Sequence, residues 1–144
     1  FWVNKHGDKS PKNFHAAQLS LPYSVAVTLK EGRALLEQYT ESNLRDLTMR
    51  RLMARTFITE DKGLPRGVSC RITMTLRNGD KLIAQVDFPK GSIQVPMTNA
   101  ELEDKFHILS DPIIGSRKAK SIVSLVWNIE ECTDVSQLFR LTQK

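Results

Sequence analysis

Two hydroxyl groups at the start of an apolar helix are the groups best suited to chemistry in this sequence. The residues from Leu21 to Leu29 are predicted to form a helix that is apolar most of the way round, with Ser20 and Tyr23 at its N-terminal end. Free backbone N–H groups and the positive end of the helix dipole suit an anionic ligand there. A buried hydroxyl without a hydrogen-bond partner costs about 2 kcal/mol or more. The pair therefore fits either a substrate pocket or a well-capped core helix, and the residues leave both open.

Histidines and cysteines add few candidates. His15 lies just before this helix and is a candidate for the same pocket, whereas Cys70 and Cys132 are far apart and form no CxxC motif. Neither the thiols nor the histidines have the spacing of metal ligands. We therefore expect reduced, structural thiols, no metal and no other cofactor. No pair of residues stands out as a catalytic base with a partner that orients it.

The composition is that of a folded domain. The chain has 144 residues, of which 40% are hydrophobic and 26% charged, enough to bury a core and too many apolar residues for wholesale disorder. The longest apolar runs are too short to span a membrane, and no basic-then-apolar leader is present. These features predict a cytoplasmic protein.

The positive charge is scattered. The formal net charge is +5, yet the basic residues form only short pairs such as Arg50-Arg51 and Arg117-Lys118, and aromatic residues make up 7% of the chain. Nucleic-acid-binding proteins usually gather basic residues on one face, together with aromatic side chains. We therefore expect a solvated basic surface and no nucleic-acid partner, while small polyanionic substrates stay compatible with this charge.

The elements that would position these residues follow from local patterns. The first part of the chain is predicted to contain, in order, a short strand at 1–4, a helix around 17–30, short helices at 41–44 and 46–54, and a strand at 55–60. Gly32 tolerates the left-handed conformation that ends a helix. Thr40 and Asp46 are typical N-cap residues for the two short helices.

A hairpin over about 68–88 is the clearest local prediction. Apolar and polar residues alternate from Val68 to Leu76, the period of a half-buried strand. Asn78-Gly79 is a two-residue turn signal because both positions of that turn need positive φ. The return strand keeps its apolar residues on one phase up to Phe88. We expect one face of the hairpin to pack against helices and the other to face water.

Helices are predicted for the remainder. Thr98 to Glu101 forms a capping box that opens a helix, and Asp111-Pro112 is expected to stop it. Residues 116–131 have helical apolar spacing, and Thr133 is expected to cap a last short helix. Helices around a small antiparallel sheet indicate an α+β fold, and residues 1–144 are predicted to form a single domain.

The chain resembles the C-terminal domain of the MmgE/PrpD family, which includes 2-methylcitrate dehydratase, cis-aconitate decarboxylase and an iminodisuccinate epimerase. Four segments carry the resemblance: Gln18–Tyr23 with Ala26 and Gly32, Tyr39-Thr40 with Leu44–Asp46, Val68–Phe88 leading into Pro89-Lys90-Gly91, and Pro96-Met97 through Glu101–Phe106. They are spread over nearly the whole chain, and their order and spacing match the family.

The resemblance implies a role for Tyr23, which ends the Ser-Leu-Pro-Tyr segment: to hydrogen-bond a substrate carboxylate or to assist proton transfer. Ser20, His15 and Lys90 are the candidate substrate-binding residues. Many relatives have His after the Lys90-Gly91 loop, where this chain has Ser92. The resemblance also implies a large helical domain before this one, which supplies most active-site groups, so we expect this chain alone to be inactive.

Two functions follow. One is the C-terminal domain of a metal-independent lyase or isomerase that acts on a small di- or tricarboxylate by dehydration, decarboxylation or epimerisation. The other is a non-catalytic, degenerate fragment that serves in dimerisation or partner binding. The chain begins with Phe1-Trp2-Val3 and lacks an initiator Met, so we expect a fragment or processed product. Isolated from a helical partner, it should expose an apolar patch bordered by helix 17–30 and self-associate, for example as a homodimer.

Overall fold

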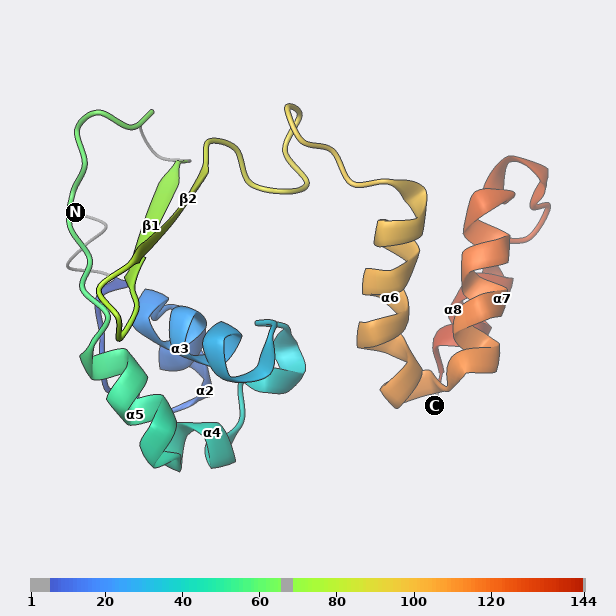
Figure 1. Cartoon of the computed structure of the whole chain (residues 1–144). Helices are drawn as coiled ribbons and strands as arrows, with labels where there is room; N and C mark the ends of the chain where they lie inside the picture. Colours follow the sequence, from blue (N-terminus) through green and yellow to red (C-terminus); the bar gives the residue numbers. More distant parts are fainter. Residues whose placement is uncertain (1–5, 66–68, 144) are drawn as a thin grey trace. The chain divides into compact units, whose positions relative to one another are not determined.

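The computed structural model describes residues 6–65 and 69–143 (Figure 1). The predicted strand at 1–4 and the first residue of the predicted hairpin, Val68, lie outside the described residues. The chain divides into two compact units, Phe1–Gly63 and Leu64–Lys144. An α+β arrangement is confirmed, because helices occur in both units and an antiparallel hairpin in the second.

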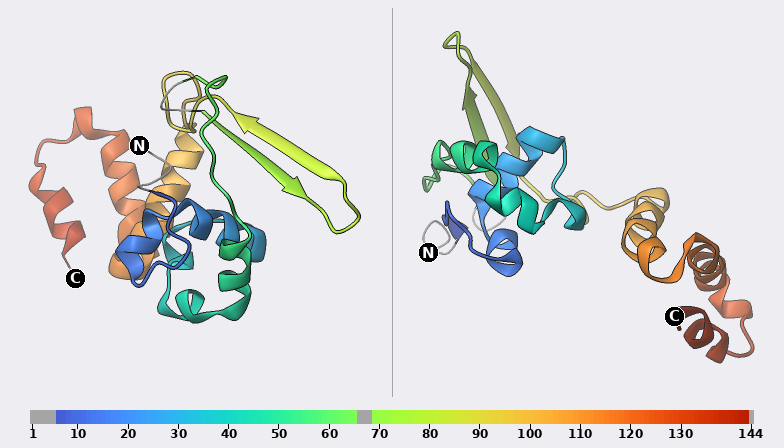
Figure 2. Two further views of the ribbon diagram at one scale, coloured as in Figure 1. Left: turned by 90° about the vertical axis from the view of Figure 1, so that its left-hand side faces the viewer. Right: turned by 90° about the horizontal axis from the view of Figure 1, so that it is seen from below.

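The first unit is helical. Its described elements, shown together in Figure 2, are α2 (Phe14–Gln18), α3 (Leu21–Glu31), the 3₁₀ helix η1 (Leu36–Gln38), α4 (Glu41–Arg45) and α5 (Leu47–Ala54). The single helix predicted around 17–30 is two helices, because Ser20 adopts an extended backbone and caps α3. Pro22 lies in the first turn of α3, where its missing N–H removes no helical bond. Gly32 ends α3 with φ 79°, as predicted.

Local capping was predicted correctly in this unit, whereas the strand was not. Thr40 Oγ1 accepts a hydrogen bond from Asn43 N (3.1 Å) and Asp46 Oδ1 accepts one from Met49 N (2.9 Å), which opens α4 and α5. Residues 56–61 form no regular structure. A strand needs a neighbour to satisfy its backbone groups, and the sheet of the described residues contains only the two hairpin strands.

The core of the first unit lies between α2, α3, α4 and α5. Its buried apolar members are Ala17, Tyr23, Ala26, Val27, Leu44, Met49 and Met53. Tyr23, Val27, Met49 and Met53 are the largest of these side chains that are fully buried, each at most 1% exposed. Burial of three or four such side chains supplies several kcal/mol of hydrophobic stabilisation, at about 1.5–3 kcal/mol each. The apolar helix that carries Tyr23 is therefore the centre of this core.

The hairpin of the second unit is confirmed, with a different turn. Strands β1 (Cys70–Thr75) and β2 (Lys81–Val86) pair antiparallel, from Cys70 opposite Val86 to Thr75 opposite Lys81. Among the described residues only glycines have positive φ, so Asn78 does not. Leu76 N donates to Asp80 O and Gly79 N to Leu76 O, while Gly79 has φ 92°. This is a three-residue loop with glycine at the left-handed position, the next commonest hairpin turn.

Both faces of the hairpin are exposed, which differs from the expected packing against helices. Every residue of β1 and β2 is exposed except Met74, which is half-buried. Most apolar residues do share one face, because Ile72 lies opposite Ala84 and Met74 opposite Leu82, whereas Ile83 lies opposite Thr73 on the other face. The alternation of apolar and polar residues thus predicts which face of the hairpin is apolar. It does not predict whether another element packs on that face.

The last part of the chain contains α6 (Asn99–Ile114), α7 (Ser116–Trp127), the 3₁₀ helix η2 (Ile129–Glu131) and α8 (Ser136–Thr142). The capping box is confirmed, with Glu101 N donating to Thr98 Oγ1 (3.3 Å) and Thr98 N to Glu101 Oε2 (2.8 Å). The predicted stop at Asp111-Pro112 is wrong, because α6 continues to Ile114 and ends at Gly115 with φ 83°.

The last helices also differ in their limits from the prediction. The helix predicted over 116–131 is α7, which ends before Asn128 and is followed by η2. The final helix begins at Ser136, where Asp134 Oδ1 accepts from Ser136 N (2.9 Å), and Thr133 is not its cap. Within residues 6–65 and 69–143, no helix is both long and apolar enough to cross a membrane.

Candidate functional site

The hydroxyl of Ser20 joins the start of α3 to the preceding loop. Its Oγ accepts a hydrogen bond from Tyr23 N (3.0 Å) and donates one to the carbonyl oxygen of Asp8 (2.5 Å). The side chain is 1% exposed. Ser20 thus uses its hydroxyl as donor and acceptor within the protein, and it holds the segment before α2 against the N-terminus of α3.

Tyr23 lies in the interior of the same unit. Its side chain is 0% exposed, and its hydroxyl donates a hydrogen bond to the carbonyl oxygen of Gln38 (2.9 Å). Its ring stacks on Tyr39, with ring centroids 5.1 Å apart. Burial raises the pKa of the Tyr23 phenol, because desolvation disfavours the phenolate. The group therefore stays protonated at neutral pH and acts as a hydrogen-bond donor.

A polar network surrounds the acceptor of this phenol. Asn43 Nδ2 donates to the same Gln38 carbonyl (2.9 Å) and to Glu31 Oε1 (2.8 Å). Lys30 Nζ donates to Asn43 Oδ1 (2.8 Å) and to Asp46 Oδ2 (3.1 Å). The pKa of Asp46 lies below its usual value, mainly because its carboxylate accepts a hydrogen bond from the Met49 backbone N–H. The hydrogen bond from Lys30 is the second cause. The network joins the C-terminal end of α3 to η1, α4 and α5.

Tyr39 is a neighbour of Tyr23 that was not among the predicted site residues. It is half-buried, and its hydroxyl lies 3.1 Å from Ser24 Oγ on α3. Ser24 Oγ in turn donates to the carbonyl oxygen of Ser20 (3.1 Å). Tyr39 follows a 3₁₀ helix and has no periodic spacing with α3, so only its place in the Tyr39-Thr40 segment of the family resemblance could have singled it out.

The other two predicted site residues lie elsewhere. His15 is exposed on α2, with its ring edge-on to Phe14. Lys90 belongs to the second unit, where Nζ lies 2.8 Å from Glu101 Oε2. The Lys90 ammonium and the Thr98 backbone N–H and hydroxyl lower the pKa of Glu101 to about 2. The structure therefore brings together Ser20 and Tyr23, and it gives Lys90 a carboxylate partner of its own.

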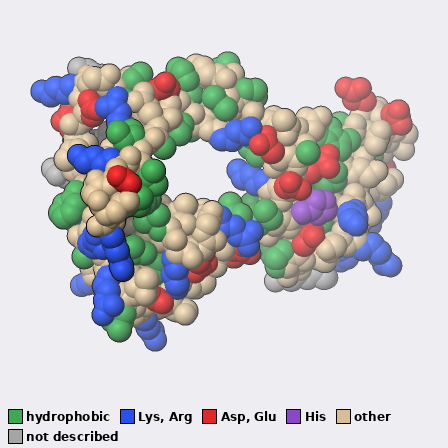
Figure 3. Space-filling view, viewed as in Figure 1, with side chains coloured by type: hydrophobic (Ala, Val, Ile, Leu, Met, Phe, Trp, Pro, Cys, Tyr) green, Lys and Arg blue, Asp and Glu red, His purple; other side chains and the backbone are tan. Residues whose placement is uncertain are grey.

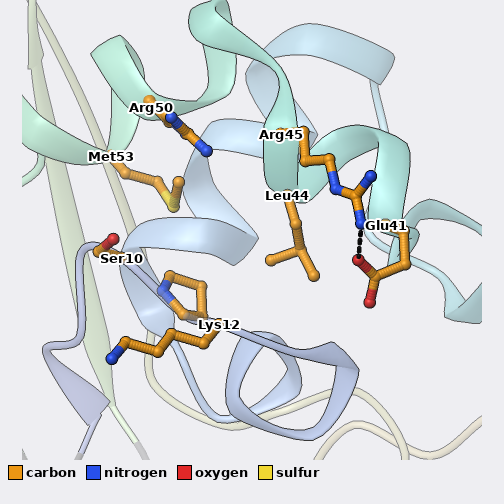
Figure 4. Close-up of a pocket in the computed structure, with 8 residues that line it drawn as sticks. Ser10, Lys12, Glu41, Leu44, Arg45, Arg50 and Met53 are labelled. Carbon is orange, nitrogen blue, oxygen red and sulfur yellow. Dashed lines mark hydrogen bonds and ion pairs between the residues drawn. The ribbon is translucent and has the colours of Figure 1, made fainter.

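An open cavity lies on the first unit, with a volume of about 270 Å³. Figure 4 shows seven of its lining residues labelled; the full lining is Ser10, Pro11, Lys12, Glu41, Leu44, Arg45, Arg50 and Met53. Leu44 and Met53 are buried members of the core cluster that contains Tyr23. The cavity thus has an apolar floor that is the outer edge of this core, and a rim that is mostly basic.

Metal-binding clusters are absent from the described ranges 6–65 and 69–143. No group of three or more His, Cys, Asp or Glu side chains in these ranges is placed to hold an ion. Cys70 and Cys132 are free, and Cys70 is exposed on β1. The arrangement of this chain offers hydroxyl, ammonium and guanidinium donors, which bind anions or donate protons.

Comparison with known proteins gives a consistent match. The family model of the MmgE/PrpD C-terminal domain matches residues 2–131. A cis-aconitate decarboxylase of Aspergillus terreus is 25% identical over 140 residues, covering 93% of this chain. The human cis-aconitate decarboxylase is 24% identical over 134 residues, covering 91% of this chain. A cis-aconitate decarboxylase-like protein of Aspergillus oryzae is 26% identical over 137 residues. The chain spans 28% of the length of each of these relatives.

Proposed function

Since the chain belongs to the MmgE/PrpD family through its C-terminal domain, we propose that it is the C-terminal domain of a lyase or isomerase acting on a small di- or tricarboxylate. The family match over residues 2–131 carries this proposal. Relatives named cis-aconitate decarboxylases favour decarboxylation as the reaction. Dehydration and epimerisation next to a carboxylate are the other reactions that the resemblance implies. The cytoplasmic location stays a prediction.

Tyr23 is the proposed catalytic residue of this chain, as a proton or hydrogen-bond donor. Loss of CO₂ from a carboxylate leaves a carbanion-like centre that must be protonated, and a phenol kept protonated by burial suits a donor better than a base. The hydroxyl donates to Gln38 O, so contact with substrate requires that this bond be exchanged. Gln38 O would keep its second donor, Asn43 Nδ2, so the exchange leaves no buried carbonyl unpaired.

Ser20, His15 and Lys90 are proposed to contribute to substrate binding rather than to the chemical step. Each has a donor that can hold a carboxylate, although Ser20 and Lys90 are engaged with Asp8 O and Glu101. Substrates with two or three negative charges need several such donors. We propose that the chain alone is inactive, and that a preceding helical domain completes the site.

The test is Tyr23→Phe in the full-length protein, with decarboxylation of cis-aconitate as the assay. Loss of a proton donor should lower kcat by about 100-fold or more. Tyr39→Phe is the control. It keeps the ring that stacks on Tyr23 and removes only a hydroxyl, which bonds to Ser24 alone among the described residues. Unchanged kcat in Tyr23→Phe, with the fold intact, would mean that Tyr23 only supports the core.

The second candidate is a non-catalytic module for dimerisation or partner binding. The exposed apolar side chains of the second unit favour it, since Leu82 is 56%, Trp127 50% and Phe139 66% exposed. Apolar surface of this kind commonly marks an interface. Sedimentation of the purified chain tests the homodimer directly, and failure of the full-length protein to bind any di- or tricarboxylate would favour this candidate over the lyase.

A further inference from the structure

Three donors around the cavity of the first unit have no partner among the residues that the structure describes. The Ser10 hydroxyl, the Lys12 ammonium and the Arg50 guanidinium form no side-chain hydrogen bond or ion pair with any described residue. All three side chains belong to exposed residues. They come from two segments distant in sequence: Ser10 and Lys12 precede α2, and Arg50 is on α5.

Some cations elsewhere in the described part of the same unit have partners, whereas the side chains of Arg51, Arg55 and Lys62 have no hydrogen bond or ion pair with a described residue. Lys30 is paired with Glu31 and Asp46, and Arg33 with Glu37. Lys9 Nζ donates to Ala54 O and lies 3.8 Å from the centre of the Phe57 ring. Lys12 and Arg50 differ from Arg51, Arg55 and Lys62 in their position, because among these five cations only Lys12 and Arg50 line the cavity.

The charge around the cavity is positive. Lys12, Arg45 and Arg50 contribute three positive charges and Glu41 one negative charge, a net of +2 for the lining. Glu41 Oε2 is bound to Arg45 Nη2 at 3.3 Å, so the only acid of the rim is already compensated. Figure 4 shows Arg50 extending from α5 toward the middle of the cavity and Lys12 along the opposite edge, while Arg45 turns to Glu41.

From this geometry we infer that the cavity is a binding site for a small oxyanion with two or more negative charges. The guanidinium of Arg50 can bind two oxygens of one carboxylate or phosphate group, and Lys12 supplies a second point charge. Ser10 adds a neutral hydroxyl donor. The volume of about 270 Å³ suits a ligand smaller than a nucleotide. Pro11, Leu44 and Met53 form the apolar surface against which the ligand's carbon skeleton rests.

Calorimetric titration of the full-length protein tests this site, with citrate and inorganic phosphate as separate probes at constant ionic strength. Acetate, which carries a single charge, is the third probe. Saturable binding of citrate or phosphate, with acetate at least about tenfold weaker, is the expected result. Tighter binding of citrate identifies a polycarboxylate site, and tighter binding of phosphate identifies a phosphate site.

Two variants of equal net charge locate the binding. Arg50→Gln should weaken the multiply charged probe by about tenfold or more. Arg51→Gln removes the same charge from the next position of α5, which does not line the cavity, and should leave affinity within about twofold. Absence of saturable binding, or an equal loss in both variants, would overturn the inference. It does not depend on the proposed activity, because binding is measured without turnover, and Tyr23→Phe tests the reaction separately.

Discussion

The two units of this chain differ in how far they bury their own apolar residues. The first unit encloses Tyr23, Met49 and Met53 at 1% exposure or less, together with four further apolar residues. In the described part of the second unit, only Ala119 and Ile122 are buried apolar residues. Helices α6 to α8 and the hairpin therefore keep most of their apolar side chains at the surface.

This difference indicates a division of roles. The first unit satisfies its two buried hydroxyls, those of Tyr23 and Ser20, with its own backbone carbonyls. The second unit has amphipathic elements whose apolar sides need another surface to be buried. Figure 3 shows basic and acidic side chains over the visible face, with the basic side chains most frequent along its left-hand edge. The exposed apolar surface of the second unit is the feature that predicts association through it.

Deleting a core side chain of the first unit should have the largest effect. Met49→Ala removes a fully buried side chain and is expected to lower the free energy of unfolding by about 2–5 kcal/mol. Leu82→Ala, at an exposed position of β2, should change it by about 0.5 kcal/mol or less. Urea unfolding followed by circular dichroism measures both. Equal losses would show that the hairpin is covered as well as the core.

Charging the apolar face of the hairpin should have the next largest effect. Leu82→Lys is expected to weaken self-association of the isolated chain by about tenfold, because the ammonium would have to be desolvated at the interface. Thr73 lies on the other phase of β1, so Thr73→Lys is the matched control. Sedimentation over a range of concentrations gives the association constants. A monomer at all concentrations for the unchanged chain would contradict the predicted use of this face.

The smallest effect concerns the start of α6. The pKa of Glu101 is lowered from 4.5 to about 2, chiefly by Lys90. A carboxyl with a lowered pKa in the folded state stabilises that state above pH 4.5, and this contribution is lost as the pH falls toward 2. Lys90→Met should raise the pKa of Glu101 toward 4.5, whereas Lys105→Met should not. A carboxyl titration by NMR measures the shift, and no rise in Lys90→Met would refute the assigned cause.

Local chemistry was the part of the fold that the sequence predicts best. Thr40, Asp46 and the Thr98–Glu101 capping box act within three residues, so their partners can be read from spacing. The turn at Asn78-Gly79 was placed correctly, but its type depends on φ of Asn78, which the dipeptide does not determine. Pro112 was expected to end α6, yet a single missing N–H does not outweigh the helix around it.

The candidate site was predictable only in part. The spacing of Ser20 and Tyr23 predicts a capped helix start, and Ser20 Oγ does accept a hydrogen bond from the Tyr23 backbone N. Their acceptors, Asp8 O and Gln38 O, are backbone atoms brought there by the tertiary fold. No sequence pattern predicts the basic cavity, because its lining comes from the segment before α2 and from α4 and α5, which only the tertiary fold brings together.

Pro112 divides α6 into a long first segment and a short final turn, and we expect the final turn to open more often. Without an N–H at this position, the carbonyl of Ile108 receives no bond from residue 112, so the final turn up to Ile114 is held by fewer backbone bonds than the turns before it. We expect the amide protons of Ile113 and Ile114 to exchange with solvent sooner than those of the preceding turns. We therefore expect any change in the shape of α6 to begin at the end nearest Gly115.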